Sequence, residues 1–299
     1  MNSHWLSTLN RRRFARLAAL GGVACLALPA AAQIKSGDNP EASERWQQVR
    51  KSLFAGREIK TPADSVILLE APTRAEDASI VPIAIRSAFP QSKERSISKV
   101  WLIIDNNPSP ISAVFSYTLA SGKADIETRV RIDEYSHVRA VAETNDGQLW
   151  MSTRWVKASG GCSAPPGKDP VAARATMGQM RLRADTSGGS SKPALAQLMI
   201  SHPNDSGMVM DQLTRQFTPP HFVRRVDVSY AGENVLSADL DFSISENPNL
   251  RFYFQPRNGG GELKAEVVDS NDLKFQNSVA LRSGEPGDAA RQSLVQGKP

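Results

Sequence analysis

The stretch "DIETRVRID", residues 125–133, alternates apolar and charged residues with a period of two. In an extended chain one face would carry Ile126, Thr128, Val130 and Ile132. The opposite face would carry the charged residues Glu127, Arg129, Arg131 and Asp133. This alternation predicts a β-strand with one face buried and the other in water.

The same rhythm extends on both sides of this strand. Branched apolar runs occur at 65–72, 79–88 and 98–108, and residues 137–158 read as two strands joined at Asn145-Asp146-Gly147, a strong hairpin signal. After a break the pattern resumes at 178–184, 193–203, 222–241, 249–256 and 261–278, with a turn near Gly232. In the 222–241 run we expect Val226, Val228 and Tyr230 to share one face. Short strands at this spacing predict antiparallel sandwiches of Ig-like size.

The fold class is therefore all-β, with two Ig-like antiparallel β-sandwich domains joined by a flexible linker. The first domain covers 33–158 and begins with a short helix within "NPEASERWQQVRKSLFAG" (39–56), where Asn39 caps, Pro40 suits the first turn and Gly56 ends it. The linker covers 159–176, which is rich in Gly, Ser and Pro and has no apolar period. The second domain covers 177–282, and the apolar-poor tail 283–299 is predicted to be disordered.

The N-terminus predicts export. Arg11-Arg12-Arg13-Phe14 resembles a twin-arginine signal, an apolar stretch follows, and Ala30-Ala31-Ala32 precedes a cleavage point before Gln33. We therefore expect residues 1–32 to be a signal peptide and the mature protein to be periplasmic. Loss of the four arginines in the signal leaves 32 basic residues against 31 acidic ones, from 36 and 31 in the full chain. A net charge of +1 gives no electrostatic case for binding nucleic acid or an anionic membrane.

The cysteine count singles out one thiol. Cys25 leaves with the signal peptide, so Cys162 stays unpaired in an oxidising compartment. Such a thiol indicates either a reactive group or intermolecular pairing, here a disulfide-linked dimer. The predicted mature chain keeps three of the four histidines and no second cysteine, which makes a zinc site improbable, and we interpret His137, His202 and His221 as structural. No Gly-rich phosphate loop is present, so a nucleotide cofactor is not expected, and the sequence predicts no metal or other cofactor.

Short motifs in order along the chain resemble the two subunits of the SoxYZ sulfur-compound carrier. The first half resembles SoxY through "LFAGREI" (53–59), "LEAPTRAEDASIVPIAI" (69–85), "DNNPSP" (105–110), "HVRAVAET" (137–144) and "GGC" (160–162). The second half resembles SoxZ through "LMISHPNDSGM" (198–208), "TPPHFVRRVDVSYAGENVLSADL" (218–240) and "SENPNLRFYF" (245–254). The fused arrangement looks most like the carriers called quinoprotein dehydrogenase-associated SoxYZ-like proteins.

The resemblance implies a carrier function. In that family a cysteine on a swinging arm carries a sulfur intermediate covalently between periplasmic enzymes; a haem enzyme attaches thiosulfate and a manganese hydrolase releases sulfate. Cys162 matches the carrier cysteine, and Gly160 and Gly161 match the flexible pivot. The sequence departs from the family pattern after the cysteine, where Ser163-Ala164-Pro165-Pro166 replaces two glycines and the chain runs on into the second half.

For such an arm we expect a thiol of ordinary reactivity and exceptional access. Lys157 and Lys168 lie close in sequence and would favour the thiolate only slightly on a solvated loop. The tether from the strand end near Val156 gives a reach of about 20 Å, at roughly 3.3 Å per residue. A looped arm presents two chain segments, so we expect a partner with an open cleft.

Two other classes of function stay open. The first is a non-covalent accessory module that docks to a periplasmic quinoprotein (PQQ) alcohol dehydrogenase system. The second is a thiol enzyme, which the sequence favours least because Cys162 has no visible general base or pocket. Substitution of Cys162 by serine separates a carrier from a docking module.

Overall fold

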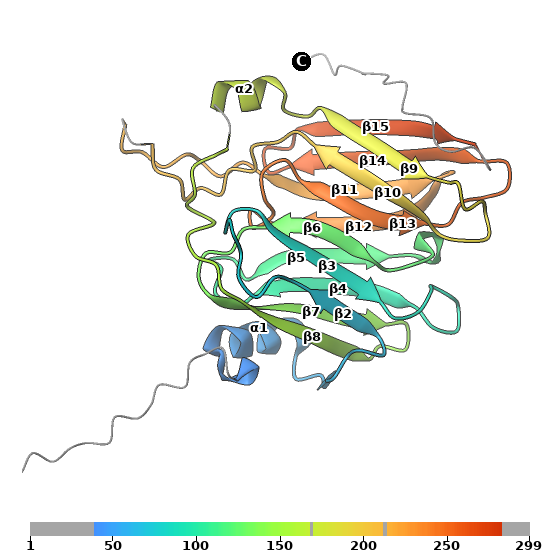
Figure 1. Cartoon of the computed structure of the whole chain (residues 1–299), viewed down its shortest axis with the longest axis horizontal. Coiled ribbons are helices and arrows are strands. Elements are labelled where there is room, and N and C mark those ends of the chain that lie inside the picture. Colours follow the sequence, from blue (N-terminus) through green and yellow to red (C-terminus); the bar gives the residue numbers. More distant parts are fainter. Residues whose placement is uncertain (1–38, 168–169, 212–213, 283–299) are drawn as a thin grey trace, which may run out of the picture. The chain divides into compact units, whose positions relative to one another are not determined.

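The computed structural model describes residues 39–167, 170–211 and 214–282. The predicted signal peptide (1–32) and the predicted disordered tail (283–299) lie outside these residues. Strands account for most of the regular secondary structure of the described chain, as Figure 1 shows.

The described part of the first half contains two short 3₁₀-helices, one α-helix and eight strands. In chain order these are η1 (Pro40–Ala42), α1 (Glu44–Phe54), β1 (Ile59–Lys60), β2 (Ile67–Glu70), β3 (Val81–Ser87), β4 (Ile97–Ile104), β5 (Ile111–Tyr117), η2 (Leu119–Ser121), β6 (Ile126–Val130), β7 (Ser136–Thr144) and β8 (Leu149–Val156). A second 3₁₀-helix, η2, separates β5 from β6.

The second half contains seven strands after one short helix. In chain order these are α2 (Pro170–Ala175), β9 (Met180–Asp185), β10 (Ala194–Ile200), β11 (Val223–Tyr230), β12 (Glu233–Leu240), β13 (Asn249–Phe254), β14 (Gly261–Asp269) and β15 (Lys274–Leu281). Helix α2 lies inside the segment 159–176 that the sequence presents as a linker.

Within the described residues the strands form two sheets that both halves share. One has nine strands in the order β1-β8-β7-β4-β5-β12-β11-β14-β15, and the other has six in the order β2-β3-β6-β13-β10-β9. Each half supplies strands to both sheets and so forms a sandwich, as predicted. Pairings between adjacent strands are antiparallel except for the short parallel contact of β1 with β8.

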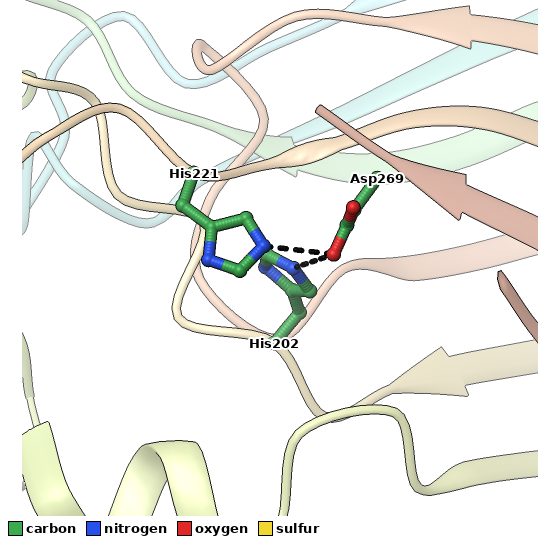
Figure 2. A group of neighbouring side chains, drawn as sticks. All are labelled: His202, His221 and Asp269. Atoms are coloured by element: carbon green, nitrogen blue, oxygen red, sulfur yellow. Dashed lines mark hydrogen bonds and ion pairs between the residues drawn. The ribbon is translucent and has the colours of Figure 1, made fainter. Parts of the chain in front are cut away.

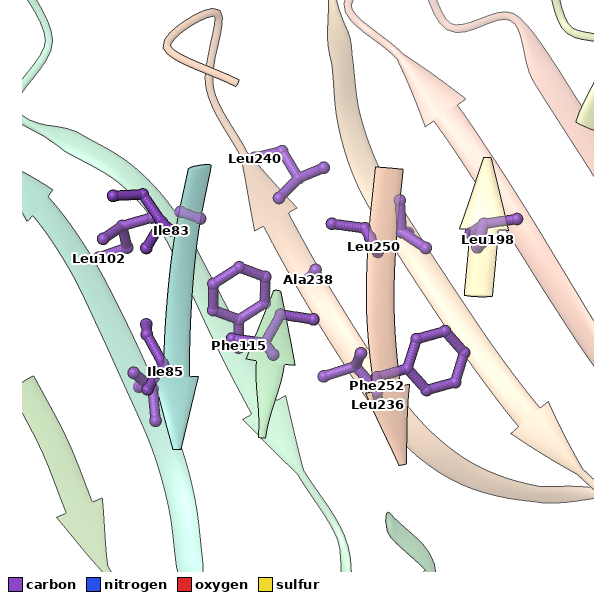
Figure 3. Close-up of a cluster of buried hydrophobic side chains, with 14 of the residues drawn as sticks. Ile83, Ile85, Leu102, Phe115, Leu198, Leu236, Ala238, Leu240, Leu250 and Phe252 are labelled. Atoms are coloured by element: carbon purple, nitrogen blue, oxygen red, sulfur yellow. The ribbon is translucent and has the colours of Figure 1, made fainter. Parts of the chain in front are cut away.

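The two sandwiches join edge to edge. Strand β5 pairs with β12, with Phe115 opposite Ala238, and β6 pairs with β13, with Glu127 opposite Arg251. Each of these pairings closes a sheet edge that would otherwise leave backbone groups unpaired. One buried apolar cluster therefore runs through both halves, and Figure 3 shows Phe115 beside Ala238 at the junction.

Strand β6 confirms the alternation that predicted it, with one exception. Ile126, Thr128 and Val130 are buried while Glu127 and Arg129 are partly exposed. Arg131 was expected on the charged outer face, and this was wrong. The strand ends at Val130, and the buried guanidinium of Arg131 donates to the carbonyl oxygens of Phe242 at 2.9 Å and Ile244 at 2.7 Å.

The N-terminal helical segment is two helices instead of one. Asn39 caps η1, with Pro40 in its first turn, and Ser43 then caps α1 by accepting a hydrogen bond from Trp46 N. Trp46 and Val49 are buried in a smaller apolar cluster on the outer face of the nine-stranded sheet. At 11 residues α1 is the longest helix described, and no described helix is long and apolar enough to cross a membrane.

The predicted hairpins are confirmed. β7 and β8 pair around Gly147, which has φ +79°, and β11 and β12 pair around Gly232, which has φ +82°. Glycine adopts these left-handed conformations at little cost. Val226, Val228 and Tyr230 are all buried on one face of β11.

Candidate functional site

The segment that follows β8 is held against the end of the first sandwich. Lys157 N donates to Thr73 O at 2.9 Å, and Lys157 O accepts from Ala75 N at 3.1 Å. Further on, Gly160 N donates to Asp133 O at 2.7 Å and Gly161 N donates to Ile132 O at 2.9 Å. These bonds satisfy the backbone as a short stretch of sheet would. We call residues 159–167 the cysteine segment.

Gly160 and Gly161 have distinct local roles in this docked conformation. Gly160 has φ +79°, a conformation that glycine adopts without strain. A Cβ on Gly161 would lie 2.1 Å from Ala78 O and 2.7 Å from Ile132 O, so only glycine fits there. Close packing therefore explains Gly161 in this structure, and its service as a pivot stays a prediction.

The Cys162 side chain is buried, with 1% of its surface exposed, and its thiol is free. The expectation of exceptional access is wrong for this conformation. Burial raises the pKa of the thiol to about 12; the carboxylates of Asp133 and Asp241 raise it too, while Arg131 opposes them. Among the described residues the charges that act on the thiol are thus these three groups, and Lys157 is not one of them; Lys168 lies outside the described residues.

The glycines and prolines of the cysteine segment predict an irregular backbone. They do not show whether this backbone packs against the first sandwich. The carbonyl oxygens of Ile132 and Asp133 lie just beyond the last residue of β6, where no neighbouring strand uses them. Two consecutive glycines can approach these acceptors closely. The irregular segment is therefore ordered against the sandwich end.

We expect Cys162 to react slowly in the native protein. At pH 8 the mature chain should react with iodoacetamide at least about tenfold more slowly than the same chain unfolded in urea, because burial suppresses the thiolate. Cys162 is the only cysteine after the predicted signal peptide, so the label reports one site. Equal rates in the two states would show that the segment is undocked in solution.

The same pKa shift predicts an alkaline loss of stability. The folded-state pKa lies above the usual 9.0, so the folded protein holds the thiol proton more tightly than the unfolded chain does. The stabilisation of the folded state by the protonated thiol is complete below pH 9 and is lost as the pH rises toward 12.

The second half covers the cysteine segment through Ser206. Its hydroxyl donates to the carbonyl oxygen of Cys162 at 2.5 Å, and both residues are buried. The neighbouring Asn204 fixes this loop by donating to Ile244 O and accepting from Val223 N, each at 2.9 Å. No sequence pattern points to Ser206, since a lone serine 44 residues from the cysteine has nothing around it that distinguishes it.

Two of the three histidines meet beside this loop. Figure 2 shows His202 and His221 facing Asp269 at the end of β14. Asp269 Oδ2 lies 2.7 Å from His221 Nε2 and 3.5 Å from His202 Nε2. His137 lies elsewhere, against the ring of Trp155. Sequence reasoning missed this cluster, because nothing local links residue 269 to residues 202 and 221.

The hydrogen bonds of the cluster favour a proton-bearing network over a metal centre. Three potential ligand atoms lie within 4.8 Å of one another. His202 Nδ1, however, accepts from Asn204 N at 3.0 Å, so the neutral ring carries its proton on Nε2, the atom that faces Asp269. The 2.7 Å separation of His221 and Asp269 is a direct hydrogen bond, shorter than the roughly 3.3 Å expected between two ligands of tetrahedral zinc.

The buried His202 predicts an acid loss of stability. Burial, followed by the neighbouring His221, lowers the pKa of His202 to about 4 from the usual 6.5. As the pH falls, His202 is therefore protonated in the unfolded chain before it is protonated in the folded protein. The free energy of unfolding should fall as the pH drops from 6.5 to 4. Urea unfolding at pH 7 and pH 5 measures the change, and His202→Gln should flatten it. An unchanged slope in that variant would assign the acid loss to other groups.

A separate open groove of about 810 Å³ lies on the outer face of the six-stranded sheet. Arg86 and Arg251 line it and both bond to Glu127, at 2.6 and 2.7 Å. Cys162 is not among its lining residues. We interpret this groove as a solvated network of ion pairs on the sheet surface.

Comparison with protein families matches the two halves separately. The model for "Sulfur oxidation protein SoxY" matches residues 50–162, and the model for "Sulphur oxidation protein SoxZ" matches residues 180–280. The SoxY match ends on Cys162 itself. A search of curated proteins found no match.

Solved structures give only distant likeness. A superoxide reductase (neelaredoxin) from Ignicoccus hospitalis is 14% identical over 31% of this chain and 80% of its own, with a TM-score of 0.29. The fibronectin(III)-like modules of Clostridium thermocellum CbhA are 13% identical over 78% of this chain and 100% of their own, with a TM-score of 0.21. These scores support no inference about this protein.

The family matches and the fold agree on how the chain is organised. Each matched region supplies one sandwich, and the unmatched residues between them hold α2. Both families are proteins of sulfur oxidation. Residues 50–162 match the SoxY family and residues 180–280 match the SoxZ family, so one chain combines a SoxY part and a SoxZ part, as in a fused SoxYZ-like protein.

Proposed function

We propose that the protein is a periplasmic carrier that holds an intermediate of sulfur-compound oxidation covalently on Cys162 and presents it to partner enzymes. One observation carries this proposal. The SoxY match ends at Cys162, the only cysteine of the mature chain, on the segment between the two sandwiches.

Loading of a thiosulfate-type cargo is a two-electron oxidation, and a haem partner serves as the oxidant. The Cys162 thiol loses its proton, and its sulfur forms an S–S bond with the terminal sulfur of thiosulfate. Two electrons pass to the haem partner, and an S-thiosulfonate remains on the carrier. The carrier supplies the nucleophile and its position, and it is not itself the enzyme.

Loading requires the cysteine segment to leave its docked position. A thiol with a pKa of about 12 is almost fully protonated at neutral pH and is closed to a partner. Undocking breaks the backbone bonds of Gly160 and Gly161 and the Ser206 bond to Cys162. Each such bond contributes about 0.5–1.5 kcal/mol, so a partner can offset the loss with ordinary contacts.

Intact mass spectrometry of the mature protein from its native periplasm, with and without reductant, tests the proposal. We expect an adduct on Cys162 that reductant removes, with the mass of a thiosulfonate, sulfonate or sulfur chain, and none in Cys162→Ser. A bare thiol under every growth condition, with normal growth of the Cys162→Ser strain, would contradict it. That result would favour a non-covalent module for a quinoprotein alcohol dehydrogenase.

A further inference from the structure

A projecting hairpin begins at the loop that covers Cys162. Two described segments between β10 and β11, residues 205–211 and 214–221, are here together called the finger; residues 212–213 lie outside the described chain. Asp205 pairs with His221 at its base, and Met210 pairs with Phe217 near its tip. Figure 1 shows it extending beyond the strand ends on the left. The bond from His221 to Asp269 anchors its base to the nine-stranded sheet.

The finger presents large apolar side chains to solvent. Phe217 is 58% exposed and Met210 is 36% exposed. Two further exposed apolar side chains flank the cysteine segment: Tyr135 lies two residues after Asp133, and Ile80 lies two residues after Ala78. Clustered exposure of this kind marks an interaction surface more often than scattered exposure does.

Helix α2 completes the surface around the cysteine segment. A pocket of about 170 Å³ lies between the finger, α2 and the far end of the segment, with Val209, Arg174 and Pro166 among its lining residues. Val171 on α2 is also exposed. We call this set of exposed apolar residues the apolar rim; it comprises Ile80, Tyr135, Val171, Met210 and Phe217.

Acidic groups surround the apolar rim. On the described parts of these segments the partly or fully exposed carboxylates outnumber the exposed basic groups; the acids are Asp133, Glu134, Asp205, Asp211 and Glu246, and the basic residues are Lys157, Arg174 and Arg215. A partner that covers this end therefore needs an apolar centre bordered by Lys or Arg. Opposite charges at the border speed association and set orientation.

We propose that the finger and the apolar rim dock the enzyme that loads Cys162, through an apolar patch bordered by basic residues on that enzyme. The inference rests on the proposed carrier function. Docking also opens the site, because Ser206 at the base of the finger bonds to the carbonyl of Cys162. A partner that displaces the finger breaks this bond and frees the cysteine segment where the enzyme is already bound.

The test uses purified full-length mature protein and a periplasmic extract from a host strain that lacks it, with thiosulfate supplied. Intact mass follows the rate of adduct formation on Cys162. We expect Phe217→Ser to slow loading at least about tenfold, because hot-spot aromatic residues carry much of an interface. Leu119→Ser is the matched control, since Leu119 is 43% exposed on η2, away from the cysteine segment. Raising NaCl from 20 to 300 mM should slow loading of the wild type as well.

Two readouts separate docking from other effects. The iodoacetamide rate of Cys162 should be the same in Phe217→Ser as in the wild type, which excludes an effect on the thiol itself. Equal loading of Phe217→Ser, Leu119→Ser and wild type would overturn the docking surface and leave the carrier function standing.

If the wild type does not load in this extract, cross-linking tests the docking surface separately from the loading chemistry. A photoreactive residue at position 217, compared with one at 119, is then used in the same extract. A salt-sensitive cross-link from 217 alone to a protein identified by mass spectrometry as a haem-containing oxidoreductase supports docking; a cross-link to a hydrolase or another class of protein overturns it. A cross-link to a second copy of this chain, or no cross-link, overturns it.

Discussion

Replacement of Gly161 by alanine is expected to raise the iodoacetamide rate of native Cys162 at least about tenfold, toward the rate of the unfolded chain. The added Cβ would lie 2.1 Å from Ala78 O, a backbone atom that cannot move aside alone. Docking of the segment rests on a few hydrogen bonds, each contributing about 0.5–1.5 kcal/mol, which is less than such an overlap costs. The segment should leave, and the thiol should gain water and ionise near its usual pKa.

Gly167→Ala is the matched control for this result. It lies on the same segment, and its added Cβ would meet only the end of the Glu246 side chain, at 3.0 Å. Its thiol rate should equal that of the wild type. Circular dichroism and the urea midpoint check that both variants keep the fold. An unchanged rate in Gly161→Ala would mean that the thiol is already exposed in the resting protein.

Asp105→Ala should destabilise the protein by about 3–5 kcal/mol, because it leaves the charge of Arg139 buried without its partner. Both side chains are buried and joined by two bonds, Arg139 Nε to Asp105 Oδ1 at 2.8 Å and Nη2 to Oδ2 at 2.7 Å. The guanidinium also lies over the Trp46 ring, so the pair fixes α1 to the sheet. Urea unfolding of the mature protein measures the loss.

Two further variants make the result specific. Asp239→Ala removes an exposed partner of Arg225 and should cost less than about 1 kcal/mol. Asp105→Leu combined with Arg139→Met replaces both charges by apolar groups and should recover much of the stability lost in Asp105→Ala. A small loss in Asp105→Ala would show that water reaches Arg139 in the variant.

The period-two alternation of apolar residues predicted the strands, because local sequence determines which of their side chains are buried. Ile126, Thr128 and Val130 face the core wherever the partner strands come from, and Gly147 and Gly232 satisfy turns whose geometry is local. The pattern contained nothing about which edges would meet. The pairing of β5 with β12 depends on surfaces more than a hundred residues apart in the chain.

The sequence predicted which residue forms the candidate site, Cys162, but did not predict that its thiol is buried. Cys162 stands out by elimination and by resemblance, but its burial depends on acceptors supplied by Ile132 and Asp133 and on a hydroxyl supplied by Ser206. Arg131 was misassigned for the same reason, because its acceptors belong to residues 242 and 244 of the other half. Long-range polar contacts leave no period in a sequence.

The edge-to-edge joints have a consequence for biosynthesis. A ribosome that has made only the first sandwich has produced β5 and β6 but not β12 and β13, so two hydrogen-bonding edges stand open until the rest of the chain emerges. Open edges recruit foreign strands and promote aggregation. In a two-gene arrangement that hazard would last until a separate subunit diffused in, whereas here the complementary strands arrive on the same chain and in equal number. Fusion therefore shortens the time for which the edges of β5 and β6 stand open. It also ensures that the two halves are always made in equal amounts.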